Sequence, residues 1–194
     1  MMGKKKNKAP VAPPAPPKPP GMLLRENGVL FLSGCFDEDN IMPLVTAIHE
    51  MNLEENKPAE IKLYINSEGG EVRYCWQLID AMRTSEIPVT TIATGLAASC
   101  GVITLMAGHK RIVCHNAQVM SHTYSSGSAG KEAELEARRK SHEMMSASII
   151  AHYEKFTGYG EKYIRKHLLK QTDVWLTPEE CVKYRIADEV LETY

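Results

Sequence analysis

The chain has 194 residues, of which 43% are hydrophobic and 24% are charged, and its formal net charge is −1. This composition is typical of a soluble globular chain, and the longest apolar runs are far shorter than the roughly 20 residues of a membrane helix. The five cysteines are scattered and never form a CxxC pair, which excludes a disulfide framework and a zinc site and favours a reducing compartment such as the cytoplasm. Neither a metal nor a cofactor is expected.

Residues 1–21 form a low-complexity segment that holds seven of the eleven prolines, five lysines and no acidic residue. The rest of the chain therefore carries a net charge of −6. We expect 1–21 to be a disordered extension and 22–194 to form one domain. A basic tail can bind nucleic acid, but the remaining chain has no basic stripe with interleaved aromatic residues, so no nucleic-acid partner is expected.

Strands and helices are predicted to alternate through the first half of the chain. Residues 28–34, 61–65 and 89–93 favour buried strands, with amphipathic helices after the first two. The second strand is expected to end in a glycine-bearing turn at 66–70. The order β-α-β-α-β-α predicts an α/β fold with parallel strands, and ligands bind at the carboxyl ends of such strands.

Ser99 lies among small residues where the third strand is expected to turn into a helix over 102–107. Such a turn exposes the hydroxyl, and small neighbours let a substrate carbonyl come within about 3 Å of it. By itself, this composition is more often a tight turn or a site of close helix packing. The predicted turn at Gly69-Gly70 lies at the same sheet edge, where backbone N–H groups would stand beside the hydroxyl as an oxyanion hole requires.

His122 is expected at the end of a strand over 118–122, just before the glycine- and serine-rich loop 124–130. It alone among the seven histidines combines a strand end with an open polar loop. A lone histidine is more often structural than catalytic. The imidazole nevertheless titrates near neutral pH, which suits a general base.

A long amphipathic helix is predicted over residues 131–156. At 1.5 Å per residue it would extend about 38 Å, so we expect it to project from the body and to need a partner for its apolar stripe. Further along, Thr177 to Glu180 form a capping box with proline at the first helical position. Asp173 precedes it in an irregular segment, where an acid is ordinarily solvated or caps a turn. Residues 186–191 are expected to form the last strand.

The order Ser99, His122, Asp173, with the turn Asn66-Ser67-Glu68-Gly69-Gly70 upstream, resembles the proteolytic subunit of the Clp protease (ClpP), a family of serine peptidases. The resemblance covers roughly residues 28–194 of the chain. The matching stretches are 63–70, 95–101, 119–122, 157–158, Asp173 and 176–180.

The resemblance implies the ClpP/crotonase fold, an α/β class with a repeated β-β-α head and a long projecting handle helix at about 123–160. It implies Ser99 as nucleophile, His122 as general base and Asp173 as the group that orients the imidazole. The backbone N–H groups of Gly70 and Cys100 would bind the oxyanion. The Cys100 thiol receives no role.

The family also implies partners. Seven subunits would form a ring that encloses the sites, and an AAA+ Clp-type ATPase would deliver unfolded polypeptides, because this chain has no Walker-type loop. The sequence departs from the family at Glu68 and Tyr124, where proline is usual. It also has Lys170-Gln171-Thr172 in place of a Glu-Arg pair that links two rings, so a single heptameric ring is expected more than a stacked pair.

Two other functions remain compatible with these residues. One is a catalytically silent ClpP-like subunit that scaffolds a ring, although such subunits usually lack members of the triad. The other is a crotonase-like acyl-CoA enzyme, which would share an oxyanion hole but would not need this serine, histidine and aspartate.

Overall fold

The computed structural model describes residues 22–124 and 131–192. The predicted extension 1–21 and most of the predicted loop 124–130 lie outside the described residues. The strands are β1 (Val29–Phe36), β2 (Ile61–Gly70), β3 (Val89–Ala98), β4 (Lys110–Cys114), β5 (Gln118–Ser121), β6 (Val174–Leu176) and β7 (Glu189–Leu191). The helices are α1 (Met22–Glu26), α2 (Glu38–Leu53), α3 (Val72–Thr84), α4 (Cys100–Met106), α5 (Glu132–Thr157), α6 (Glu161–His167) and α7 (Pro178–Lys183).

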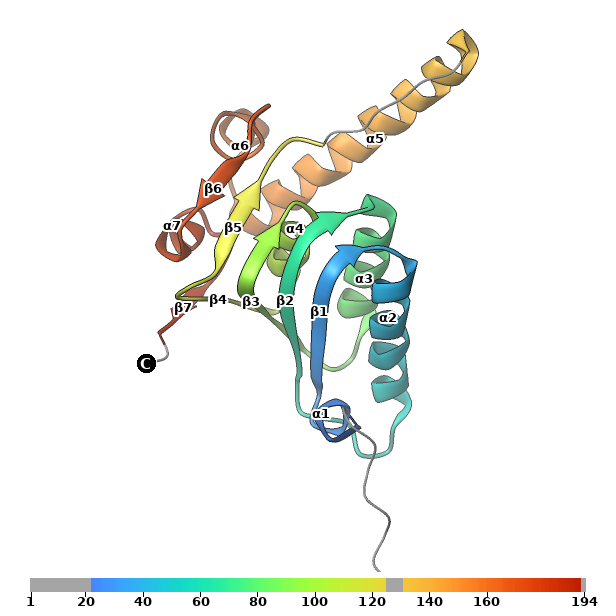
Figure 1. The fold of residues 1–194 in the computed structure, drawn as a ribbon, viewed down its shortest axis with the longest axis vertical. Helices are drawn as coiled ribbons and strands as arrows, with labels where there is room; N and C mark the ends of the chain where they lie inside the picture. Colours follow the sequence, from blue (N-terminus) through green and yellow to red (C-terminus); the bar gives the residue numbers. More distant parts are fainter. Residues whose placement is uncertain (1–21, 125–130, 193–194) are drawn as a thin grey trace, which may run out of the picture.

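The strands described form one seven-stranded sheet, and the predicted α/β class is confirmed (Figure 1). Along the sheet the order is β1-β2-β3-β4-β7, and these neighbours run parallel. β5 branches from the carboxyl half of β3, and the short strand β6 pairs antiparallel with β5. β5 therefore continues the sheet at the end of β3 that leads into α4, which brings a later part of the chain to that edge.

The sheet has one well-covered face, and the alternation of buried residues shows which. On β1, Leu30 and Leu32 are buried while Phe31 between them is 56% exposed. Helices α2, α3 and α4 pack together and cover the buried face (Figure 1). A side chain that leaves water in this way contributes about 1.5–3 kcal/mol, so the alternation fixes which face of each strand is the core.

Side-chain caps fix where two of the helices begin. The Asp37 carboxylate accepts a hydrogen bond of 3.0 Å from the Asn40 N–H and begins α2. At α7 the predicted capping box is confirmed, because the Thr177 hydroxyl accepts from the Glu180 N–H and the Glu180 carboxylate accepts from the Thr177 N–H. Each such cap is worth about 1 kcal/mol.

The structure corrects two expectations about strands. Residues 66–70 are not a turn, because β2 continues to Gly70 after a register shift between Ile65 and Ser67 and pairs there with the end of β1. Glycines at 69 and 70, with φ of 101° and 149°, let the strand bend without ending. The segment after Asp173 was not expected to be a strand, yet it forms β6.

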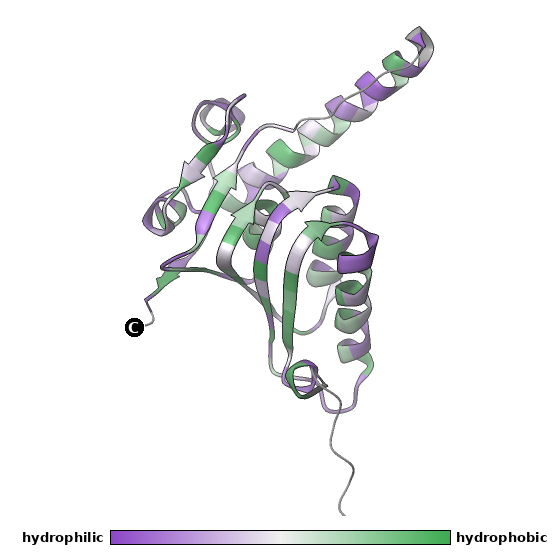
Figure 2. Cartoon of the chain, viewed as in Figure 1, coloured by the Kyte–Doolittle hydropathy of each residue, from purple (hydrophilic) through white to green (hydrophobic). Residues whose placement is uncertain are grey.

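The predicted long helix is confirmed as α5, which extends beyond the body of the molecule (Figure 1). Its inner end is anchored by the buried residues Ile149, Ile150 and Tyr153. Its outer half is mainly hydrophilic in Figure 2, with Leu135 and Met144 left 39% and 64% exposed. Among the described residues, no helix combines the length and apolarity needed to cross a membrane.

Candidate active site

Ser99 occupies the strained turn between β3 and α4, as its sequence context predicts. Its backbone has φ 54° and ψ −114°, a conformation that a residue with a side chain rarely adopts. The Ser99 N–H donates a hydrogen bond of 2.9 Å to the Met120 carbonyl on β5, which holds the turn against that strand. Strain of this kind costs about 1–3 kcal/mol and is typical of a nucleophile displayed at a strand-to-helix turn.

His122 follows β5 directly and faces this serine. Its Nε2 lies 2.9 Å from the Ser99 Oγ, within hydrogen-bond distance. The pairing of β5 with β3, in which Met120 lies opposite Ala98, puts the two strand ends side by side. The two residues are 23 positions apart in the sequence, and this parallel pairing brings them together. A serine hydroxyl bonded to a neutral imidazole is an arrangement in which the imidazole can accept the proton.

Asp173 lies near His122 but does not touch it. Its Oδ1 is 3.8 Å from the His122 Nδ1, which is longer than a hydrogen bond. The carboxylate side chain is 55% exposed, whereas that of the histidine is 25% exposed. β6 begins immediately after Asp173 and pairs Val174 with Ser121, so the antiparallel strand brings the acid to the imidazole.

Gly70 and Cys100, the predicted oxyanion donors, lie on the two chain segments that enclose Ser99. A Cβ placed on the neighbouring Gly69 would be 2.7 Å from the Ser99 Cβ and 3.1 Å from the Cys100 nitrogen. The end of β2 is therefore in direct contact with the Ser99 turn, and only glycine fits at position 69. Gly70 also lines the same small pocket as Ser99, so backbone of the β2 end lies close to the serine.

A pocket of about 120 Å³ opens beside the Ser99 hydroxyl. Its walls combine the apolar side chains of Val72, Ile103 and Ile149 with polar groups to a similar extent, and its size suits a substrate side chain of modest volume. A wider cleft of about 570 Å³ adjoins it and shares Gly70, Val72 and Tyr124. The small pocket is lined by Gly70, Val72, Ser99, Ile103, His122, Tyr124, Ile149 and Tyr153.

Tyr153 and Ser121 form a buried pair behind the pocket that sequence reasoning did not single out. The Tyr153 hydroxyl lies 2.7 Å from the Ser121 Oγ, and either hydroxyl can donate the hydrogen bond between them; burial raises the pKa of the Tyr153 hydroxyl, which therefore keeps its proton at neutral pH. The position of Tyr153 on the apolar stripe of the long helix, four residues after Ile149, was the available signal. Its partner on β5 could be identified only from the fold.

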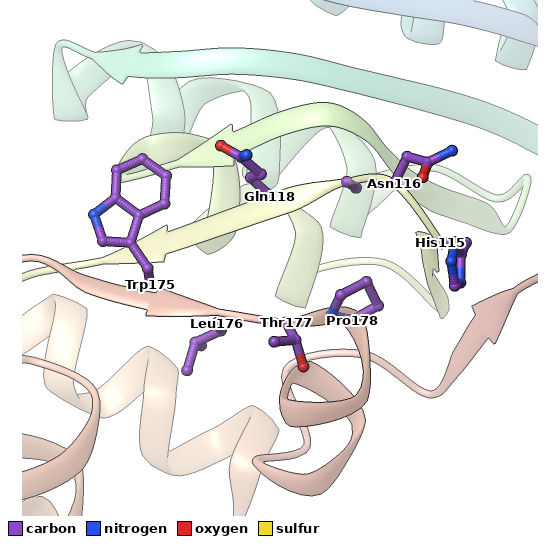
Figure 3. A pocket seen from close by; sticks show the side chains of 8 residues that line it. His115, Asn116, Gln118, Trp175, Leu176, Thr177 and Pro178 are labelled. Carbon is purple, nitrogen blue, oxygen red and sulfur yellow. The ribbon is translucent and has the colours of Figure 1, made fainter.

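The pocket in Figure 3 is separate from this chemistry. It has a volume of about 510 Å³ and lies between the segment that leads into β5 and the segment that joins β6 to α7. The exposed Trp175 indole and the Gln118 side chain are among the groups that line it (Figure 3). None of the five predicted site residues lines it, so its size does not make it the active site.

Within the described ranges no three His, Cys, Asp or Glu side chains gather where they could hold a metal ion. None of the five cysteines, all of which lie in the described ranges, is paired in a disulfide.

Comparison with known proteins connects this geometry to a family. The family model described as Clp protease matches residues 20–194. The ATP-dependent Clp protease proteolytic subunit of Deinococcus radiodurans is 34% identical over 140 residues, which are 71% of this chain and 68% of that protein.

Proposed function

The chain belongs to the Clp protease family, and we propose that it is a serine-type endopeptidase that hydrolyses peptide bonds with Ser99 as its nucleophile. The 2.9 Å contact between the Ser99 Oγ and the His122 Nε2 is the observation that carries this proposal. A free serine hydroxyl is a weak nucleophile, and a base at hydrogen-bond distance is what activates it.

In the proposed reaction, His122 takes the hydroxyl proton as the Ser99 Oγ attacks the substrate carbonyl carbon. The Gly70 and Cys100 N–H groups stabilise the negative oxygen of the tetrahedral intermediate, and one such donor is typically worth about 3–4 kcal/mol of barrier. His122 then gives the proton to the leaving amine, and water hydrolyses the acyl-enzyme by the same steps. Asp173 stabilises the protonated imidazole after a shift that closes the 3.8 Å separation.

The substrate is an unfolded polypeptide whose side chain before the cleaved bond enters the 120 Å³ pocket. Val72, Ile103 and Ile149 line that pocket, so leucine, methionine or a residue of similar size and polarity is favoured there. The wider adjoining cleft leaves room for an extended chain on one side of the serine.

The proposed assembly is a heptameric ring in the cytoplasm that encloses the sites, with an AAA+ Clp-type ATPase as the partner that unfolds and delivers substrates. Two observations support it. The relative from Deinococcus radiodurans is named as an ATP-dependent proteolytic subunit, and the outer half of α5 projects with apolar side chains exposed.

Cleavage of an unfolded protein tests the proposed activity. Purified chain is incubated with casein and with a fluorogenic peptide that carries leucine before the scissile bond, beside the Ser99→Ala variant. We expect peptide cleavage by the wild type and none by Ser99→Ala. Equal cleavage by the two proteins would show that Ser99 is not the nucleophile.

A further inference from the structure

The Cys100 side chain contacts a segment that is distant in the sequence, in addition to the role proposed for the Cys100 backbone N–H. It is buried, and its Sγ lies 3.3 Å from the Gly70 carbonyl oxygen, to which the thiol donates a hydrogen bond. Gly70 is 30 residues earlier, on β2. The bond therefore joins the two segments whose backbone N–H groups are proposed to hold the oxyanion.

The Cys100 thiol bonds to the peptide unit that joins Gly70 to Glu71, and a second hydrogen bond holds the other side of this unit. The Glu71 N–H donates a hydrogen bond of 2.9 Å to the Phe36 carbonyl, and the same peptide unit accepts from Cys100 through the Gly70 carbonyl. This unit follows Gly70, whereas the Gly70 N–H belongs to the preceding peptide unit, and the rotatable backbone bonds of Gly70 join the two. A glycine backbone rotates more freely than any other, so the two hydrogen bonds on the following unit restrict one side of a residue that would otherwise turn. A Cβ at Gly70 would lie 2.6 Å from the Phe36 nitrogen, so no side chain can restrict that position instead.

Cys100 is itself held in place by the side chain of Cys75. The Cys75 Sγ lies 3.6 Å from the Cys100 carbonyl oxygen and 3.5 Å from the Thr104 Oγ1. Both cysteines have no exposed surface, so neither thiol exchanges its partner for water. Buried hydrogen bonds of this kind fix side-chain geometry more firmly than exposed ones.

We propose that the Cys100 thiol is a positioning group for the oxyanion hole. By its hydrogen bond to the Gly70 carbonyl, it fixes the position of the Gly70 N–H relative to the Cys100 N–H. The inference rests on the proposed function, since it concerns a donor pair in the same site. Preorganised donors stabilise charge in the transition state without moving, so a loosened Gly70 lowers the rate of the chemical step. The Cys100 side chain does not itself line the pocket beside Ser99, so we expect substrate binding there to change little.

The test compares three full-length proteins: wild type, Cys100→Ala and Cys100→Ser. The readouts are kcat and KM for the fluorogenic peptide and the rate of covalent labelling of Ser99 by a fluorophosphonate. One hydrogen bond contributes about 0.5–1.5 kcal/mol, so we expect Cys100→Ala to lower kcat and the labelling rate about three- to tenfold, with KM within about twofold of wild type. Cys100→Ser keeps a donor and should stay within about twofold of wild type in both rates.

Cys181→Ala is the matched control, because it removes another fully buried thiol that lies on α7 and outside the small pocket. It should leave kcat and the labelling rate unchanged. If Cys100→Ala does not fold, Cys100→Val replaces it as a side chain that is one heavy atom larger and carries no donor, with the same expected loss.

Four outcomes separate the positioning role of Cys100 from the proposed function. Wild-type rates in Cys100→Ala, or equal losses in Cys100→Ala and Cys100→Ser, would overturn the positioning role while leaving Ser99 as the nucleophile. A change in KM alone would also overturn it. Failure of the folded wild type to be labelled or to cleave would instead remove the proposed function itself.

Discussion

At the scale of single residues, the separation of 3.8 Å between the His122 Nδ1 and the Asp173 Oδ1 defines what the acid can contribute. A carboxylate that is half exposed is screened by water, so its effect on the imidazole depends on a closer approach in the complex with substrate. We expect Asp173→Asn to leave the fold intact and to lower kcat by about 10³- to 10⁴-fold. The measurement is peptide hydrolysis beside thermal unfolding of the same samples, and activity near that of wild type would mean that another group orients His122.

His152 is the residue whose burial has the clearest consequence for stability. It lies against the Trp76 and Phe156 rings, its Nε2 donates to the Ile103 carbonyl at 2.9 Å, and burial lowers its pKa to about 4. In the unfolded chain a histidine has a pKa of about 6.5. Below that pH the unfolded state gains a proton that the folded state does not take up. The folded state therefore loses stability as pH falls from about 6.5 toward 4.

The expected loss is about 3 kcal/mol across that interval, since each unit of pKa shift corresponds to 1.36 kcal/mol. Urea unfolding of wild type and His152→Gln at several pH values measures it. The difference between the two proteins should change with pH only below about 6.5. A difference that is constant from pH 7 to 4.5 would mean that His152 is protonated equally in the folded and unfolded states.

At the scale of elements, the hydrogen bond of 2.7 Å between Tyr153 and Ser121 joins α5 to the end of β5, one residue before His122. Removing one partner leaves the other buried and unsatisfied, so Tyr153→Phe and Ser121→Ala should each cost about 1–3 kcal/mol of unfolding free energy. The double variant should cost less than the sum of the two, because neither group is then left alone. Chemical denaturation of the four proteins gives the cycle, and strict additivity would show that the pair is not coupled.

The elements that the sequence predicted well are those with a clear period and clear caps. Alternating burial marks β1 and β2, and the capping box at Thr177 marks the start of α7. β6 was missed because it is three residues long and exists through its pairing with β5, a contact that no local pattern encodes. The prediction of a turn at 66–70 was wrong for a different reason. Glycines usually end a strand, but Gly69 and Gly70 here let a bent strand continue.

The residues of the candidate site also divide into those with a local sequence signal and those without one. Ser99 could be predicted because a strand, small residues and a helix surround it in sequence, and His122 because it ends a strand. Asp173 was singled out only through the resemblance, since its segment has no local signal. The bond between the Cys100 thiol and Gly70 joins residues 30 positions apart, and only the fold places them in contact.

At the scale of the whole molecule, the outer half of α5 exposes apolar side chains in the single chain. Leu135 and Met144 there are 39% and 64% exposed, which is a cost that contact with a second copy would remove. We expect the double variant Leu135→Asp/Met144→Asp to shift the protein to smaller assemblies by light scattering on a sizing column. Leu53→Asp, at an 86% exposed position on α2, is the control that should leave the mass unchanged. An unchanged mass for the α5 variant would show that this face is not an interface.

The central claim is that Ser99 and His122 form an activated nucleophile, and covalent labelling tests it most directly. Wild type and Ser99→Ala are treated with a fluorophosphonate at neutral pH, and intact mass is recorded for each. The account predicts one label per wild-type chain and none on Ser99→Ala. Equal labelling of both proteins, or an unlabelled wild type that is folded and assembled, would contradict it.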